Sequence, residues 1–219
     1  MKEQSGSFTA STSKITELNY LIYFPSDYDP STETGLLIFL HGMGERGHDL
    51  ELVKKYGIAH EIEAGRSFPL MVVAPQCPPD TAWSHETGAL SAFLDQLEKD
   101  YRIDPNQIYL TGLSMGGYGT WWWALAEPNR FAAIAPICGG GDKWRADLIA
   151  HLPIRVFHGD RDEAVSPGAS QSMVDALKTA GAKDVELTLY PGVGHDAWTQ
   201  TYSSDVFYEW LFAQRRASR

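Results

Sequence analysis

The sequence predicts an α/β fold built on a mainly parallel sheet, and three observations carry this prediction. Short apolar runs rich in β-branched residues recur along the chain, stretches with helical spacing separate them, and most of the runs are continuous rather than alternating. Continuous runs are typical of strands buried on both faces, and a parallel sheet is covered on both faces by helices. We therefore expect helices on both faces of one sheet, in a single domain comprising residues 1–219.

The individual elements follow in chain order. Residues 15–24 alternate between apolar and polar, which is typical of an antiparallel hairpin or an edge strand ahead of the parallel part. Later strands are predicted at residues 36–40, 70–74, 108–110, 131–137, 154–157 and 187–190. Helices are predicted at residues 50–64, 90–101, 118–126, 171–179 and 206–212. Residues 1–13, rich in Ser and Thr, are expected to form a loose arm.

Composition narrows the class of partner. The formal net charge is -10 and Lys and Arg are not clustered as phosphate binding requires, so no nucleic-acid partner is expected. No apolar run reaches the roughly 20 residues of a membrane helix, and residues 1–10 lack the apolar segment of a secretory leader. With only Cys77 and Cys138 and no CxxC pair, a cytoplasmic setting is expected. A secreted protein whose leader had been removed is the alternative, because its sequence would look the same.

A G-x-S-x-G pattern formed by Gly112, Ser114 and Gly116 follows one predicted strand and opens the next helix. It resembles the nucleophile elbow of α/β-hydrolases, in which small residues on both sides of the serine let strand and helix pack closely around a strained turn. Such a turn exposes the Ser114 hydroxyl. The N–H of Met115, at the start of the helix, then points toward the same region and can stabilise an oxyanion. The lysine of a phosphate-binding loop is absent.

A serine hydroxyl needs a base, and three histidines follow Ser114 in the chain. His195 lies in a glycine-containing loop after the last predicted strand, at the carboxyl end where active sites of such sheets gather. His158 ends an apolar strand, so a buried structural histidine is expected there. His151 precedes that strand at the opposite end of the sheet. We therefore predict that His195 is the base.

The acid is expected between Ser114 and His195. Asp162 follows the strand at residues 154–157 and reaches further than Asp160, which is better placed to accept backbone N–H groups. Asp142, after the preceding strand, stays open as an alternative because it also lies at a carboxyl end. Asp196 is adjacent to the base and is interpreted as a turn residue.

The loop His41-Gly-Met-Gly-Glu-Arg-Gly follows the second strand, and its glycines allow an N–H to turn inward as a second oxyanion donor, for which we choose Met43.

The segments LIFLHGMGERG, APQCP, TGLSMGGYGTW, APICGGG, FHGDRDEAV and GVGHDAW resemble compact carboxylesterases related to the dienelactone hydrolases and the phospholipase/carboxylesterases. That resemblance implies an α/β-hydrolase fold of about eight strands, the triad Ser114, Asp162 and His195, and oxyanion donors at Met43 and Met115. It also implies that Cys77 and Cys138 lie too far apart for a disulfide.

The expected function is hydrolysis of short-chain, soluble esters through an acyl-enzyme, with a small-molecule ester as the only expected partner. Trp83 and Tyr118 are candidates to contact the substrate, although packing is an equal alternative for Trp83. Only residues 139–152 are available for a cap after the fifth strand, so an open cleft without a cap domain is expected.

The alternative functions are those of a small peptidase, a feruloyl or acetyl esterase of plant polysaccharides, and a catalytically silent binding protein. No metal or other cofactor is expected, because His60-Glu61 lacks the second His of an HExxH motif.

Overall fold

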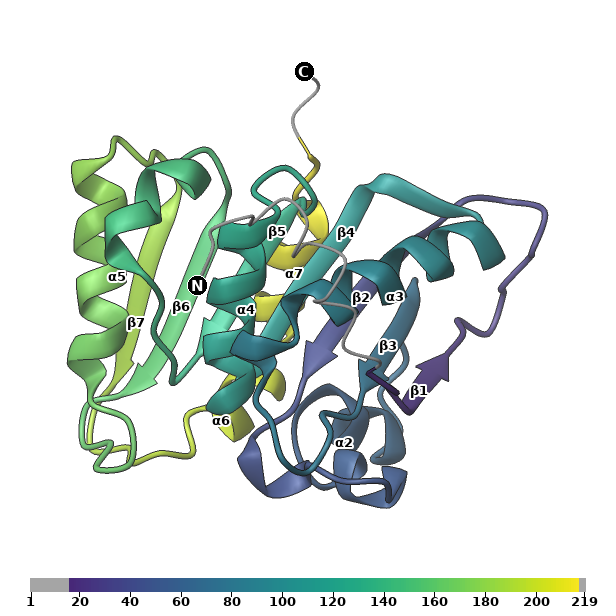
Figure 1. Ribbon diagram of the computed structural model, residues 1–219, viewed down its shortest axis with the longest axis horizontal. Helices are drawn as coiled ribbons and strands as arrows, with labels where there is room; N and C mark the ends of the chain where they lie inside the picture. Colours follow the sequence, from purple (N-terminus) through teal and green to yellow (C-terminus); the bar gives the residue numbers. More distant parts are fainter. Residues whose placement is uncertain (1–15, 217–219) are drawn as a thin grey trace, which may run out of the picture.

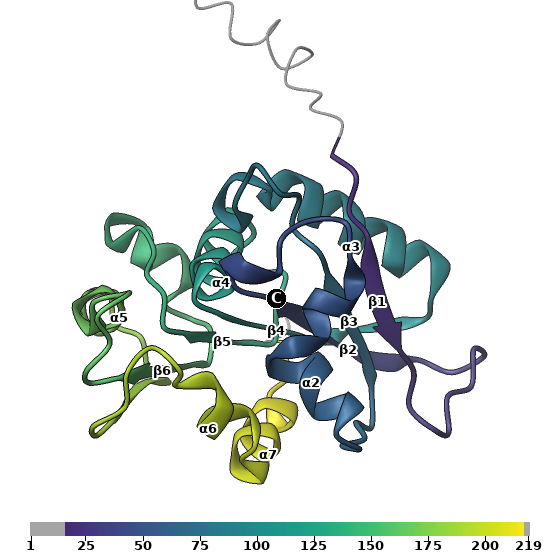
Figure 2. The ribbon, with the colours of Figure 1, turned by 90° about the horizontal axis from the view of Figure 1, so that it is seen from below.

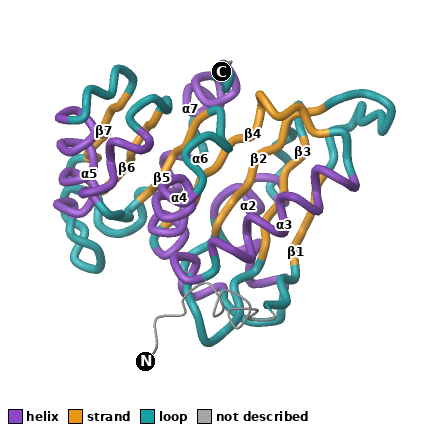
Figure 3. The backbone as a smooth tube through the Cα atoms, turned by 45° about the horizontal axis from the view of Figure 1, so that its top comes forward, coloured by secondary structure: helices purple, strands orange, loops and turns teal. Residues whose placement is uncertain are grey.

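The computed structural model describes residues 16–216, and a seven-stranded sheet runs through the centre of this part of the chain (Figure 1). The strands are β1 (Tyr20–Tyr23), β2 (Thr34–Leu40), β3 (Met71–Pro75), β4 (Ile103–Leu113), β5 (Ala133–Ile137), β6 (Ile154–Gly159) and β7 (Val185–Tyr190). They lie in the order β1-β3-β2-β4-β5-β6-β7, which can be followed across Figure 3. β1 runs antiparallel to β3, whereas all other neighbours in this sheet are parallel. The predicted mainly parallel sheet is therefore confirmed.

Helices cover both faces of the sheet (Figure 2). One face carries α3 (Thr87–Asp100), α4 (Met115–Ala126) and α5 (Pro167–Thr179), and the other carries α2 (Gly57–Glu63), α6 (Trp198–Tyr202) and α7 (Asp205–Ala213). Short 3-10 helices lie in the connections: η2 (Met43–Glu45), η3 (Leu50–Lys55), η4 (Trp83–His85) and η5 (Lys143–Ile149). No helix in residues 16–216 combines the length and apolar character that a membrane crossing requires.

The central strands are apolar throughout because both of their faces are buried. In β2, Leu36, Ile38 and Leu40 pack into the core below α3 and α4, whereas Leu37 and Phe39 pack into the core on the α2 and α7 side. All five side chains have at most 1% of their surface exposed. Burial of alternate residues on opposite faces removes the alternation that a half-exposed strand would show. This explains why continuous apolar runs marked the strands correctly.

The structure corrects some expected boundaries. The predicted helix at residues 50–64 is divided into η3 and α2 at Gly57, which has a φ of 70° and no room for a Cβ against the Phe39 ring. The short helix α6 was not expected. The described residues form seven strands, where the resemblance implies about eight, and β1 is the edge strand that was one of the two forms expected for residues 15–24. The expected arm at residues 1–13 lies outside the described residues.

Parallel order brings the loops after β2, β4, β6 and β7 to one edge of the sheet, because the carboxyl ends of parallel strands lie together. The loop after β5 has no cap domain: between Gly139 and Leu152 it contains only the short helix η5. Both cysteines are buried and neither forms a disulfide.

Candidate active site

Ser114 occupies a strained turn between β4 and α4. Its φ of 52° and ψ of −115° lie in a region that non-glycine residues rarely adopt, and its N–H donates to the Ile137 carbonyl of β5 at 2.9 Å. A Cβ on Gly116 would overlap the Leu40 carbonyl, and one on Gly112 would overlap the Gly116 carbonyl. Only glycine therefore fits on either side of the serine, which gives the G-x-S-x-G pattern a steric cause in this chain.

The histidine and aspartate chosen from the sequence lie beside this turn. His195, in the loop between β7 and α6, has its Nε2 2.9 Å from the Ser114 Oγ. Its Nδ1 is 2.6 Å from Oδ2 of Asp162, which follows β6. The Asp162 side chain is fully buried, whereas 28% of the His195 side chain is exposed. A chain of hydrogen bonds thus leads from a buried carboxylate through an imidazole to a half-buried hydroxyl, the geometry of an activated nucleophile.

The hydrogen bonds around Asp162 favour its ionised form. Burial alone raises the pKa of this carboxyl, but hydrogen bonds from His195 and from the backbone N–H groups of Val165 and Ala164 outweigh burial and leave the pKa lowered. Asp162 is therefore a carboxylate at neutral pH. It can stabilise an imidazolium at His195 without taking the proton itself.

The competing acidic residues have other partners. Asp160 accepts the Gly192 N–H at 2.7 Å, and so holds the loop that carries His195 rather than its own turn. Asp142 caps η5 through the Trp144 N–H at 3.1 Å. Asp196 accepts both the N–H and the hydroxyl of Thr199 at the start of α6. None of these three contacts reaches the His195 ring.

Sequence reasoning missed the contacts that three further side chains make with Asp162 and His195. His158, fully buried in β6, has its Nε2 3.1 Å from Asp162 Oδ2. The Cys138 thiol donates to the His195 carbonyl at 3.2 Å, and the Trp198 ring meets the His195 ring edge-on with centroids 5.1 Å apart. In the sequence, the only signal for these contacts is that the residues lie near strand ends, because the contacts themselves join segments far apart in the chain.

The loop nominated for the oxyanion donors lies against the nucleophile. A Cβ on Gly42 would stand 3.8 Å from the Ser114 Cβ. Met43 and Met115 are the first residues of η2 and α4, where helix geometry provides no acceptor for the N–H within the helix. The Met43 side chain itself is 58% exposed, so any role of this residue rests on its backbone.

His41 fixes the loop from inside the protein. Its Nε2 accepts the Cys77 N–H at 2.9 Å, and its Nδ1 therefore donates to the Gly42 carbonyl at 2.6 Å. Burial lowers the pKa of His41 to about 4, so the ring is neutral at neutral pH. Arg46 donates to the carbonyls of Met43 and Thr81, which braces the same loop from its outer side.

The two substrate-contact candidates differ in the structure. Trp83 has no exposed surface, donates from Nε1 to the His41 carbonyl at 3.0 Å, and packs directly on Gly119. It is a core residue, so packing fits the structure better than substrate contact, the two alternatives left open for it. Tyr118, half-buried and one helical turn after Ser114, borders an open hollow of about 410 Å³. This hollow is lined by Tyr118, Trp122, Gly140, Gly141, Asp142, Lys143, Trp144, Ala169 and Ser172, and Trp144 is 85% exposed.

Among residues 16–216, one group of side chains has donor atoms close enough to hold a metal ion. The atoms of Cys138, His158 and Asp162 lie within 4.8 Å of one another. Metal ions bind the thiolate, but burial raises the pKa of Cys138 to about 12, and both oxygens of Asp162 already accept hydrogen bonds. This donor set therefore fits a hydrogen-bonded support for the acid better than a metal site.

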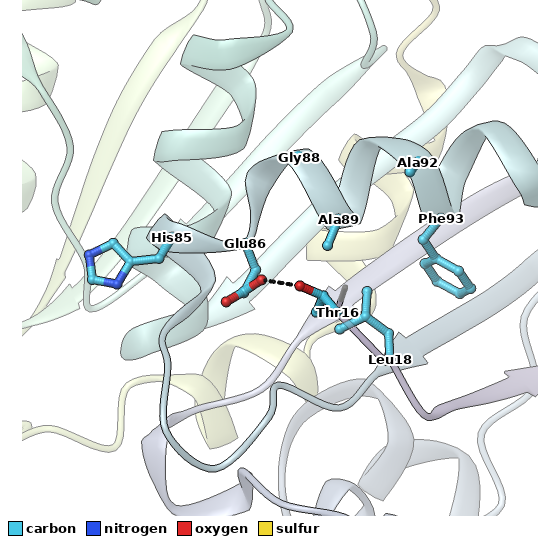
Figure 4. Close-up of a pocket in the computed structure, with 8 residues that line it drawn as sticks. All are labelled: Thr16, Leu18, His85, Glu86, Gly88, Ala89, Ala92 and Phe93. Atoms are coloured by element: carbon cyan, nitrogen blue, oxygen red, sulfur yellow. Dashed lines mark hydrogen bonds between the residues drawn. The ribbon is translucent and has the colours of Figure 1, made fainter. Parts of the chain in front are cut away.

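A second hollow, of about 620 Å³, lies at the start of α3 (Figure 4). It is lined by Thr16, Leu18, His85, Glu86, Gly88, Ala89, Ala92 and Phe93, and the Thr16 hydroxyl donates to Glu86 at its inner side. None of its lining residues belongs to the Ser114 site, so the reaction has no visible use for it.

Known proteins that resemble this chain identify its family. The family model "Dienelactone hydrolase family" matches residues 81–210, a segment that includes Ser114, Asp162 and His195. The chain is 31% identical over 152 residues to the bifunctional acetylxylan esterase/xylanase of Neocallimastix patriciarum, covering 66% of this chain and 21% of that protein. It is 29% identical over 161 residues to feruloyl esterase C of Emericella nidulans, covering 70% and 58% of the two proteins. The chain thus spans only part of both relatives.

Solved structures extend the likeness over nearly the whole chain. A thermostable esterase superposes with a TM-score of 0.81 at 36% identity, covering 92% of this chain and 60% of the esterase. The matched family model accounts for more than half of the chain, and its range includes the turn at Ser114. The chain therefore belongs to the dienelactone hydrolase family and has the α/β-hydrolase fold of the esterases that it resembles.

Proposed function

We propose that this protein is a serine hydrolase that cleaves carboxylic esters, with Ser114 as nucleophile, His195 as base and Asp162 as the orienting acid. The observation that carries the proposal is the continuous hydrogen-bond chain, 2.9 Å from Ser114 to His195 and 2.6 Å from His195 to Asp162, at a strained elbow. The relatives are named as esterases, which supports ester bonds as the substrate.

The first half of the reaction forms an acyl-enzyme. His195 Nε2 takes the Ser114 proton as the oxygen attacks the ester carbonyl, and the N–H groups of Met43 and Met115 receive the developing oxyanion. The carbon–oxygen bond to the alcohol breaks, and His195 returns its proton to the departing alkoxide. In the second half a water molecule gives its proton to His195, attacks the acyl carbon, and releases the acid as the Ser114 oxygen recovers the proton.

Covalent labelling tests the assignment of the nucleophile. A fluorophosphonate probe reacts readily only with an activated serine, so peptide mapping should find the label on Ser114 and an ester panel should show turnover. Denatured protein and an Asp162→Asn variant provide the comparison, since both retain the serine and lack its activation. Absence of labelling in folded protein would favour a catalytically silent binding protein.

The proposed preferred substrates are short-chain, soluble esters. The connection after β5 holds only η5, so nothing in residues 139–152 forms a cap over Ser114 or a long apolar wall for an acyl chain. The rate should saturate smoothly with substrate concentration through the solubility limit. A jump in rate on emulsion formation, or a preference for acyl chains beyond about ten carbons, would contradict this arrangement.

A second candidate is hydrolysis of feruloyl or acetyl esters of plant polysaccharides. It is favoured by the names of the relatives and by the hollow beside Tyr118, where Trp122 and the exposed Trp144 present rings for a phenolic or sugar group. Trp144→Ala should raise KM for methyl ferulate or acetylated xylan and leave p-nitrophenyl acetate hydrolysis unchanged. Equal effects on all three substrates would exclude a role for this hollow, and cleavage of aminopeptide substrates at comparable rates would favour a peptidase.

A further inference from the structure

His158 is buried, as expected of a structural histidine, and its ring lies against the acid of the proposed triad. The side chain is fully buried in β6, four residues before Asp162. Its Nε2 is 3.1 Å from Asp162 Oδ2, the same oxygen that lies 2.6 Å from His195 Nδ1. Two imidazoles therefore converge on one carboxylate oxygen.

The neighbours of His158 assign the proton on Nε2. This nitrogen faces the Val165 carbonyl at 2.9 Å and the Asp162 carboxylate at 3.1 Å, and both of these groups only accept hydrogen bonds. Nε2 must therefore carry a hydrogen in order to satisfy its surroundings. On the other side of the ring, Nδ1 lies 2.7 Å from the Ser170 hydroxyl, which also reaches the Gly139 carbonyl at 2.9 Å. These contacts prevent the ring from flipping or sliding.

The other oxygen of the acid is fixed as well. Asp162 Oδ1 accepts the N–H groups of Ala164 and Val165, each at 2.9 Å. Without His158, the carboxylate would lose one of its two histidine contacts at Oδ2, and the other comes from His195, the residue that has to be oriented. Val165 links the two sides, because its N–H binds Oδ1 while its carbonyl faces His158 Nε2.

We propose that His158 is a positioning residue that acts through Asp162: its Nε2–H fixes the carboxylate so that His195 is held in the tautomer that accepts the Ser114 proton. This inference rests on the proposed triad function. The second donor also stabilises the carboxylate form, so that the proton of the reaction stays on His195. Losing the donor should therefore lower kcat and leave KM unchanged, because the substrate does not touch His158.

Two amide substitutions separate the two sides of the ring. His158→Gln places an N–H donor near the position of Nε2 and keeps the contact with Asp162, whereas His158→Asn keeps only a donor near Nδ1. We expect His158→Asn to lower kcat by about 10- to 100-fold and His158→Gln to recover most of that loss. The same substitution at the exposed His151 is the matched control and should change neither kcat nor KM.

A double-mutant cycle distinguishes positioning from simple structural damage. If His158 acts through the acid, His158→Asn should have little further effect on kcat in an Asp162→Asn background. The downfield proton resonance of the His195–Asp162 hydrogen bond should broaden or vanish in His158→Asn and return in His158→Gln. An equal loss in both backgrounds, or equal loss for Asn and Gln, would overturn the inference.

The proposal stays testable if His158→Asn does not fold. Ser170→Ala removes the contact at Nδ1 and leaves the Nε2 donor, so it should produce a smaller loss of kcat that again disappears with Asp162→Asn. A loss that persists in that background overturns the inference. If Asp162→Asn alone leaves turnover intact, the proposed triad fails instead, whereas a crippling Asp162→Asn with a fully active, folded His158→Asn rejects only the role of His158.

Discussion

The same dipeptide, His-Gly, stands at the carboxyl ends of β2 and β6, yet the two histidines do opposite things. His41 accepts the Cys77 N–H through Nε2, whereas Nε2 of His158 faces only acceptors and donates. Both rings are buried, with at most 1% exposed surface. The difference comes from what the fold places opposite each ring, a backbone amide at His41 and a carboxylate with a carbonyl at His158.

This comparison shows how the site divides its work. On the β2 side, a neutral histidine tethers the loop that carries Met43, and the proposed chemistry there uses backbone donors. On the β6 side, a donating histidine contacts Asp162, the proposed acid, and the proposed chemistry uses side chains. Both sides meet at Ser114, whose own position depends on backbone packing at Gly112 and Gly116.

The largest effect is expected for Ser114→Ala, which tests whether the β2 side and the β6 side of the site serve one nucleophile. Ser114→Ala removes the hydroxyl that His195 activates, and should lower kcat by roughly a million-fold. The thermal unfolding midpoint should stay the same, because alanine at this φ is as strained as serine and the hydroxyl packs against no core group. Ser203→Ala, an exposed serine, is the control. If Ser114→Ala hydrolysed substrate near the wild-type rate, Ser114 would not be the nucleophile that both sides of the site serve.

The next largest effect is expected for a substitution that changes only the β6 side of the site. Asp162→Asn should lower kcat by roughly 10,000-fold, because His195 loses the carboxylate that fixes its tautomer. Circular dichroism should show a folded protein, and the His41 side should be unaffected. Asp142→Asn, which changes only the cap of η5, should retain activity. A crippled Asp142→Asn beside an active Asp162→Asn would show that the acid has been misassigned.

A smaller effect concerns stability on the β2 side. His41 has a pKa of about 4 in the folded protein and an ordinary value of 6.5, so between these pH values the unfolded chain binds the extra proton. Stability from this site is therefore complete above pH 6.5 and declines as pH falls toward 4, by about 3 kcal/mol in total. Urea unfolding at pH 7 and pH 4.5 measures the change.

His41→Gln is the matched variant for that experiment. A glutamine oxygen can accept the Cys77 N–H as Nε2 does, and it does not titrate in this range. The variant should therefore lose less stability than the wild type between pH 7 and pH 4.5. The same acid sensitivity in both proteins would assign it to groups other than His41.

The sequence was sufficient for the parts of this molecule that depend on local pattern. Continuous apolar runs located the buried strands, and the steric demands of the elbow marked Ser114 through the two glycines beside it. The choices of Asp162 and His195 followed from strand ends that a parallel sheet brings to one edge, and the structure places both side chains within hydrogen-bond distance of one another.

What the sequence did not show depends on contacts between distant segments. Trp83 looked like a loop residue because its surroundings are rich in proline, but Gly119 leaves space for its ring inside the core. The break at Gly57 follows from the position of Phe39 on a different element. The sequence around His158 is that of an apolar strand end whether the ring is only structural or also positions Asp162. Its function depends on which groups face Nε2.

The smallest expected effect compares the two cysteines, each buried beside one half of the site. Cys77 binds His41 through its backbone N–H, whereas Cys138 donates its thiol to the His195 carbonyl. Cys77→Ala keeps the N–H. Both alanine variants lose a buried sulfur, and Cys138→Ala also loses the thiol contact with the His195 carbonyl. We expect each to lower the free energy of unfolding by about 1 kcal/mol, and Cys138→Ala alone to lower kcat/KM by about threefold, because a thiol hydrogen bond is weak. Urea unfolding and initial rates on one ester measure both quantities. Equal kcat/KM for the two variants would mean that the thiol contact does not help to hold His195.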